Sequence, residues 1–223
     1  MSDLYVALIY LSFIVLGATA PFVATLGYVW SDTFYPQLLS TLVALVPSSM
    51  IMGGMAVFLF VAIDRRSPAR FGIHTLLTLS FGIWCTITLA WAEVPVSAWD
   101  KWDWAFKTVM FSAFIPMVIR SRVQIEAFLQ VYLAAVLIHI IPVGVKTVIS
   151  GSAYGRSLGI LRGNVGLAES SALASISIAL IPLILYLGRH SVLVPASKLR
   201  SLGYFGLAMV AIPAAIGTYP ARR

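Results

Sequence analysis

The chain has 223 residues, of which 60% are apolar and only 10% are charged. Soluble domains carry about 25% charged residues, and a water-soluble fold of this size would have to bury almost every side chain, which its surface-to-volume ratio forbids. The composition therefore excludes an ordinary soluble domain and predicts that lipid solvates most of the chain. The net charge of +7 does not indicate nucleic-acid binding, because the 15 Lys and Arg residues are spread through short loops.

Seven apolar stretches follow one another along the chain. A helix needs about 20 residues to cross the hydrocarbon, and most of these stretches are long enough. They are continuously apolar rather than alternating, which argues against a closed β-barrel. We predict an all-α polytopic transmembrane bundle, a single membrane-embedded domain over residues 1–223, with about seven spans at Leu4–Val29, Leu38–Ile63, His74–Trp91, Trp104–Ile119, Val123–Ile149, Ser171–Leu187 and Leu202–Tyr219.

Proline is frequent inside these spans, where it removes a backbone hydrogen bond and tends to kink the helix. Lipid does not satisfy the freed carbonyl, so neighbouring helices must do so, which favours a packed bundle. Pro21 and the Gly53–Gly54 pair are further candidate breaks. The prolines inside the expected spans are Pro47, Pro116, Pro142, Pro182 and Pro213.

Basic residues gather in every second loop, and the intervening loops are mixed or acidic. By the positive-inside rule, this asymmetry predicts that the basic loops and the N-terminus are cytoplasmic. An odd number of spans then places the C-terminus outside. The basic loops contain Arg65, Arg66, Arg70, Arg120, Arg122, Arg189, Lys198 and Arg200.

The loop between the third and fourth expected spans is rich in tryptophan, with Trp91, Trp99, Trp102 and Trp104. Indole rings prefer the depth of the lipid headgroups, so we expect this segment to lie along the outer interface before the chain turns inward. Asp103 precedes Lys107 by four residues, the favourable order for a helical ion pair.

The ionisable residues form no recognisable catalytic or metal-binding motif. His139 is the one histidine well inside a span, where such groups are rare and often functional; a hydrogen bond to a neighbouring helix is the structural alternative. Asp100 and Asp103 share a helical face, as paired acid/base carboxylates do, but interfacial charges are also routine there. Arg122 and Glu126 are expected to form a modest surface pair.

Cys85 is the only cysteine, which excludes an intrachain disulfide and a cysteine-rich metal site. The chain also has no HExxH, CxxC or aspartate-rich motif, so we predict no metal site.

The segment Gly151–Glu169 carries five glycines and two arginines, Arg156 and Arg162, before the sixth span. Glycine-rich backbone and guanidinium groups both suit phosphate oxygens, so an anionic ligand is one interpretation. Lys146, near the end of the fifth span, can extend its ammonium group to the same depth. The alternative is a flexible loop whose arginines contact lipid headgroups.

Several segments together resemble the N-terminal region of the exosortase A-associated O-glycosylation ligases, which belong to the O-antigen ligase and polymerase-like membrane proteins. The resemblance spans essentially the whole chain, and its tryptophan-rich part is the most specific. The segments are YVWSDTFYPQ (28–37), DRRSPAR (64–70), LAWAEVPVSAWDKWDWAFKTV (89–109), IPMVIRSRVQIEAFLQVY (115–132), VKTVISGSAYGRSLGILRGNVGLAES (145–170) and AIGTY (215–219).

This resemblance implies a multi-pass protein of the bacterial inner membrane that handles an undecaprenyl-diphosphate-linked glycan in envelope or exopolysaccharide assembly, without a nucleotide cofactor. It implies that Arg156, Arg162 and Lys146 hold the diphosphate. Glu169 would orient an acceptor, or equally cap a helix. The catalytic half of such proteins lies further along, and Pro220–Arg223 departs from the expected continuation, so we expect a truncated product that is inactive alone.

Two other function classes remain open. A non-catalytic membrane module would bind a lipid-linked glycan or support proteins of envelope-polysaccharide assembly. A small secondary transporter is the weaker alternative, because the sequence has no internal repeat. All three share membrane lipid as a partner, and none involves nucleic acid.

Overall fold

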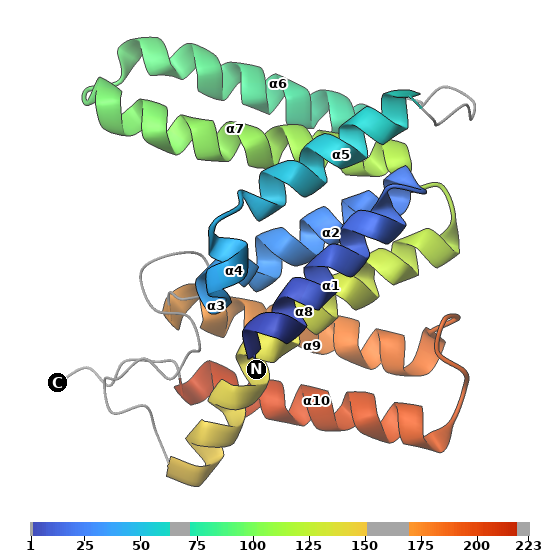
Figure 1. The fold of residues 1–223 in the computed structure, drawn as a ribbon. Coiled ribbons are helices and arrows are strands. Elements are labelled where there is room, and N and C mark those ends of the chain that lie inside the picture. Colours follow the sequence, from blue (N-terminus) through green and yellow to red (C-terminus); the bar gives the residue numbers. More distant parts are fainter. Residues whose placement is uncertain (1, 63–71, 151–169, 218–223) are drawn as a thin grey trace, which may run out of the picture.

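The computed structural model describes residues 2–62, 72–150 and 170–217, and these contain helices and no strand (Figure 1). The elements in chain order are α1 (Ser2–Gly17), α2 (Pro21–Phe34), α3 (Pro36–Leu39), α4 (Thr41–Ala44), α5 (Ser48–Ala62), α6 (Ile73–Thr88), the 3₁₀ turn η1 (Leu89–Trp91), α7 (Pro95–Val118), α8 (Arg122–Ser150), α9 (Ser170–His190) and α10 (Lys198–Gly217). The predicted all-α class is confirmed for the described residues.

Four described helical stretches are long and apolar enough to cross a membrane: Ile73–Trp91, Arg122–Ser150, Ser171–His190 and Lys198–Gly217. They correspond to the third, fifth, sixth and seventh expected spans. A membrane-embedded helical protein follows from their length and composition. The total of about seven spans and the cytoplasmic N-terminus stay predictions.

The first expected span, Leu4–Val29, is wrong, because the structure divides it into α1 and α2. The two helices pack antiparallel: a Cβ added to Gly17 would lie 3.2 Å from the Ala24 Cα, and the rings of Phe13 and Trp30 are 5.5 Å apart. Proline begins α2, where its fixed φ suits the first helical position and its missing N–H costs nothing. The short turn therefore converts one apolar run into a hairpin.

The hairpin places the start of α1 beside the end of α2. The Asp3 Oδ1 accepts a hydrogen bond of 3.3 Å from the Thr41 N–H, and the Tyr10 hydroxyl donates one of 3.3 Å to the Ser48 carbonyl. The expected orientation assumed one span before residue 30, but the structure has two helices there, α1 and α2.

The second expected span, Leu38–Ile63, is also interrupted. Tyr35 takes the left-handed conformation (φ 55°) between α2 and α3, and Pro47 lies just before α5 rather than within a helix. Gly53 and Gly54 lie inside an unbroken α5. A Cβ on Gly53 would come 3.1 Å from the ring of Tyr28, so the glycine permits close packing of α5 on α2.

The α6 and α7 helices form an antiparallel hairpin at the top of Figure 1. Most of the tryptophan-rich segment belongs to a continuous α7 that begins at Pro95, and its expected position at the outer interface stays a prediction. Trp102 donates from Nε1 to the Thr86 Oγ1 at 3.1 Å and stacks on Phe106. The expected ion pair between Asp103 and Lys107 is confirmed at 2.5 Å.

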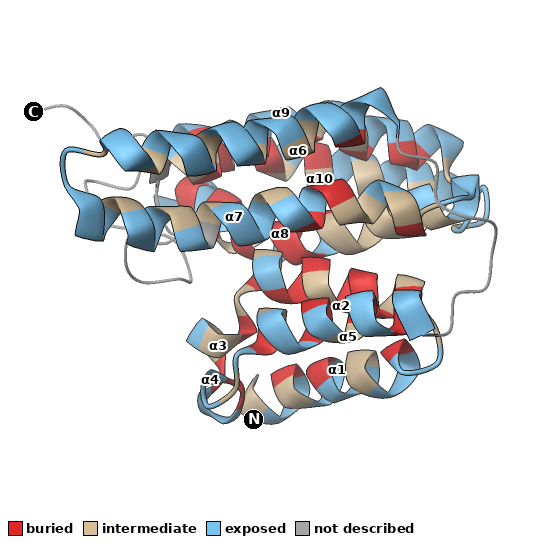
Figure 2. Cartoon of the chain, turned by 90° about the horizontal axis from the view of Figure 1, so that it is seen from above, coloured by how far each residue is buried: buried red, intermediate tan, exposed pale blue. Residues whose placement is uncertain are grey.

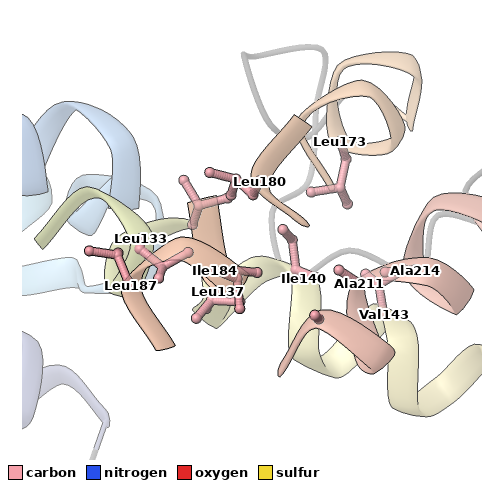
Figure 3. Packing of buried hydrophobic residues seen from close by; sticks show 12 residues of the cluster. Leu133, Leu137, Ile140, Val143, Leu173, Leu180, Ile184, Leu187, Ala211 and Ala214 are labelled. Atoms are coloured by element: carbon pink, nitrogen blue, oxygen red, sulfur yellow. The ribbon is translucent and has the colours of Figure 1, made fainter. Parts of the chain in front are cut away.

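The largest buried cluster joins α8, α9 and α10, and Figure 3 shows its side chains interdigitating. Ile140, Ile184 and Ala211 are fully buried in it. In Figure 2, α8 carries buried residues between α2 on one side and the α9–α10 pair on the other. The prolines expected inside helices are confirmed for α7, α8, α9 and α10: Pro116, Pro142, Pro182 and Pro213.

Candidate functional site

The first candidate site is the rim where the end of α8, the start of α9 and the end of α10 meet. A Cβ on Gly217 would lie 1.8 Å from the Thr147 Oγ1, and Val143 and Leu173 share the buried cluster with α10. Lys146 is exposed on the last turns of α8 at this rim. The structure therefore anchors both flanks of the segment 151–169 at one end of a packed three-helix unit.

The remaining residues predicted for this site lie outside the described residues. They are Arg156, Arg162 and Glu169. Their expected roles toward a diphosphate or an acceptor stay predictions, while Lys146 has the exposed position that such a role requires.

The opposite end of the same unit holds the best-defined polar arrangement, centred on Glu126. This side chain is only 6% exposed. Its carboxylate accepts hydrogen bonds from the N–H groups of Val192 (2.8 and 2.9 Å) and Leu193 (3.0 Å), and from the Ser191 hydroxyl. Backbone donors that point at one carboxylate stabilise its charged form and hold the loop in place.

Glu126 corrects the expectation of a surface pair with Arg122. The sequence spacing suggested an i,i+4 contact, but the carboxylate turns toward the loop between α9 and α10, which lies about 65 positions further along the chain. Three donors of that loop converge on the one carboxylate, whereas a pair with the exposed Arg122 guanidinium would contribute little in water. No local sequence signal indicates a contact of this range.

Arg200 binds the same loop from its carbonyl side. Its Nε donates to the Gly188 carbonyl at 3.1 Å, and Nη1 donates to those of Ser191 at 3.0 Å and Val194 at 2.5 Å. Nη2 reaches the Arg189 carbonyl at 3.1 Å. These bonds satisfy carbonyls that the end of α9 leaves without helical partners.

We call Glu126, the loop 191–197 and Arg200 the clasp. Close by, the Tyr204 hydroxyl of α10 donates to the Gln130 Oε1 of α8 at 2.7 Å. The clasp therefore ties the start of α8, the end of α9 and the start of α10 together through charge-assisted bonds. Its chemistry is structural, because both charged groups are already bound to backbone.

His139 is a third polar feature, in the middle of α8. It is 2% exposed and lies 5.8 Å, ring to ring, from Phe34. Its nitrogens face the end of α2, near the backbone of Thr33 and Phe34, without a hydrogen bond of standard geometry. The His139 ring thus faces a neighbouring helix, as expected, but forms no hydrogen bond of standard geometry with it. A buried polar group without a hydrogen-bond partner costs stability.

The other sequence candidates do not assemble into a site. Asp100 and Asp103 are both exposed on α7, and the Asp103 carboxylate pairs with Lys107 rather than with a second acid. Cys85 is a free, half-buried thiol. Within residues 2–62, 72–150 and 170–217, no group of three metal-ligating side chains converges.

Comparison with known proteins places the chain in a family without an assigned activity. The model of the family DUF5935, described as a family of unknown function, matches residues 1–192. The chain belongs to that family. No curated protein matches the chain. No solved structure matches it either. Family membership therefore covers α1 to α9 and leaves the function to be argued from the site.

Proposed function

We propose that this chain handles an undecaprenyl-diphosphate-linked glycan in the bacterial inner membrane, as an O-antigen ligase-like protein of envelope or exopolysaccharide assembly. The observation that carries the proposal is the rim, where three packed helix ends flank the segment with Arg156 and Arg162. Guanidinium forks match the paired oxygens of a diphosphate, and the lower dielectric near headgroups strengthens that contact. Exposed Lys146 adds a third cation at the same rim.

The apolar outer faces of α8, α9 and α10 support the same proposal. Val148, Ile178 and Ile216 are all more than half exposed. Such faces suit lipid or a polyprenyl chain, whose head would then lie at the rim. In this proposal the protein is multi-pass, with the rim at the outer surface and the basic loops in the cytoplasm.

The proposal assigns binding, not transfer, to these 223 residues alone. The resemblance places the transfer chemistry in a further C-terminal half, and Glu169 would orient an acceptor or cap α9. We expect the chain on its own to bind the donor without turning it over, and to need no nucleotide. Release of glycan from the donor by the purified chain would contradict that part.

The test measures the affinity of the purified full chain in nanodiscs for an undecaprenyl-diphosphate oligosaccharide. Arg156→Ala and Arg162→Ala should each weaken binding by about 10- to 100-fold, the value of one charge-assisted contact, and Arg→Lys should restore part of it. Lys101→Ala on α7 removes an exposed cation elsewhere and should change nothing. Unaltered affinity in both arginine-to-alanine variants would contradict the proposal.

A further inference from the structure

The clasp end of the α8–α10 unit carries an excess of basic over acidic side chains in its described residues. Residues 119–126 and 187–202 hold five Lys and Arg residues and one carboxylate, Glu126. That carboxylate is buried and bound to the backbone of the loop. Arg200 is likewise bound to carbonyls. Neither α8 nor α10 has an acid in its first turn, so within residues 119–126 and 187–202 the basic residues outnumber the one carboxylate.

Three of the basic side chains are exposed at this end of the unit, and we call them the patch. Arg122 begins α8 one turn before Glu126, Arg189 lies in the last turn of α9, and Lys198 begins α10. The clasp brings these helix ends together, and Figure 1 shows them at the same end of the molecule. The patch is therefore a consequence of folding, because its members are 76 positions apart at the extremes.

Large apolar side chains surround this patch. Each of the following is at least 45% exposed: Val123, Ile125, Val192, Leu193, Leu199 and Leu202. Cations that border exposed aliphatic groups at the end of a membrane helix match an amphiphile with an anionic head and an apolar tail. A soluble anion would use only the cations, and a neutral lipid would use only the apolar groups.

We propose that the clasp end binds an anionic phospholipid, with its phosphate at Arg122, Arg189 and Lys198 and its acyl chains along the adjacent aliphatic side chains. The site is distinct from the rim, which lies at the other end of α8. It requires that the helices lie in a membrane but does not require the glycan function, so each proposal can fail without the other.

The experiment titrates fluorescent phosphatidylglycerol, and phosphatidylcholine with the same acyl chains, into the detergent-purified full chain. Phosphatidylglycerol should bind at least tenfold more tightly. The double variant Arg189→Gln with Lys198→Gln should weaken its binding by about 30-fold, which corresponds to about 1 kcal/mol per basic residue. Phosphatidylcholine binding should not change.

The matched control removes two positive charges elsewhere. Lys101→Gln with Lys107→Gln, on the exposed side of α7, should leave phosphatidylglycerol binding intact. If the first double variant does not fold, as judged by helical circular dichroism, each single variant should still show about a fivefold loss. Equal binding of the two lipids, equal losses in both double variants, or displacement of the lipid by 10 mM inorganic phosphate would overturn the proposal.

Discussion

Glu126 and Arg200 bind opposite sides of one loop, and neither acts as a surface charge. The carboxylate collects N–H donors and the guanidinium collects carbonyls, so the turn between α9 and α10 has its polar backbone groups satisfied by two side chains. The desolvation cost of a buried carboxylate is offset only when several hydrogen-bond donors bind it. This explains why an acid lies buried near the start of the long apolar helix α8.

Replacement of Glu126 by glutamine tests that explanation. The amide would keep one oxygen but point an NH₂ group at the N–H donors of Val192 or Leu193, leaving them unpaired. We expect a loss of about 2–4 kcal/mol in unfolding free energy, measured by denaturant titration in detergent. Glu93→Gln, at an exposed acid before α7, should change stability by less than about 0.5 kcal/mol. Equal stability of the two variants would show that the clasp is not a stabilising feature.

At the scale of elements, small residues decide how closely α8 and α10 approach. A Cβ on Gly144 would lie 2.4 Å from the Val210 carbonyl oxygen, which is backbone and cannot rotate away. On the facing helix, Ala211 and Ala214 are fully buried. Small residues that let helix backbones meet are a common way of packing in lipid, where the hydrophobic effect between helices is weak.

Gly144→Ala and Gly206→Ala make a matched pair of variants for this contact. Both glycines lie inside helices, where alanine normally stabilises by about 0.5–1 kcal/mol. Gly206 has no atom within 4 Å of an added Cβ, so its variant should be as stable as the parent or more so. Gly144→Ala should lose about 1–3 kcal/mol, because α8 and α10 must separate. Thermal unfolding of both variants in one detergent checks the difference, and a stabilised Gly144→Ala would exclude the close approach.

At the scale of the whole molecule, the sequence predicts some helices much better than others. The apolar runs that became α6, α8, α9 and α10 were located to within a few residues, because each is bounded by polar or charged residues. The runs before them contain local turns, at the three residues before Pro21 and at Tyr35, that leave hydropathy almost unchanged. A count of apolar residues therefore does not detect a hairpin inside an apolar run.

The candidate sites show a similar division. Lys146 could be named from its place at the end of a span, since exposure there follows from position alone. The clasp could not, because it depends on how α8 packs against α9 and α10 and joins residues about 65 positions apart. Contacts of that kind are a product of tertiary packing, and no periodicity in the chain encodes them.

The α1–α2 hairpin and the charge asymmetry together predict which residues share a side of the membrane. The basic loops place Arg66 and Arg200 in the cytoplasm. Asp3 is bound to Thr41, and α2 packs against α7, with Tyr28 stacked on Phe111. If α1 and α2 both cross, the N-terminus then lies outside, with the α6–α7 turn, in contrast to the cytoplasmic N-terminus expected from the sequence alone.

Single cysteines in a Cys85→Ser background test this arrangement with a membrane-impermeant thiol reagent on intact cells. We expect labelling at Ser2→Cys and Asp100→Cys, and protection at Arg66→Cys and Arg200→Cys until the cells are opened. Protection of position 2 with labelling of position 100 would mean that only one helix of the hairpin crosses, which restores a cytoplasmic N-terminus. Labelling of position 200 but not of position 100 would invert the whole molecule, because the clasp and the α6–α7 turn lie at opposite ends of the bundle.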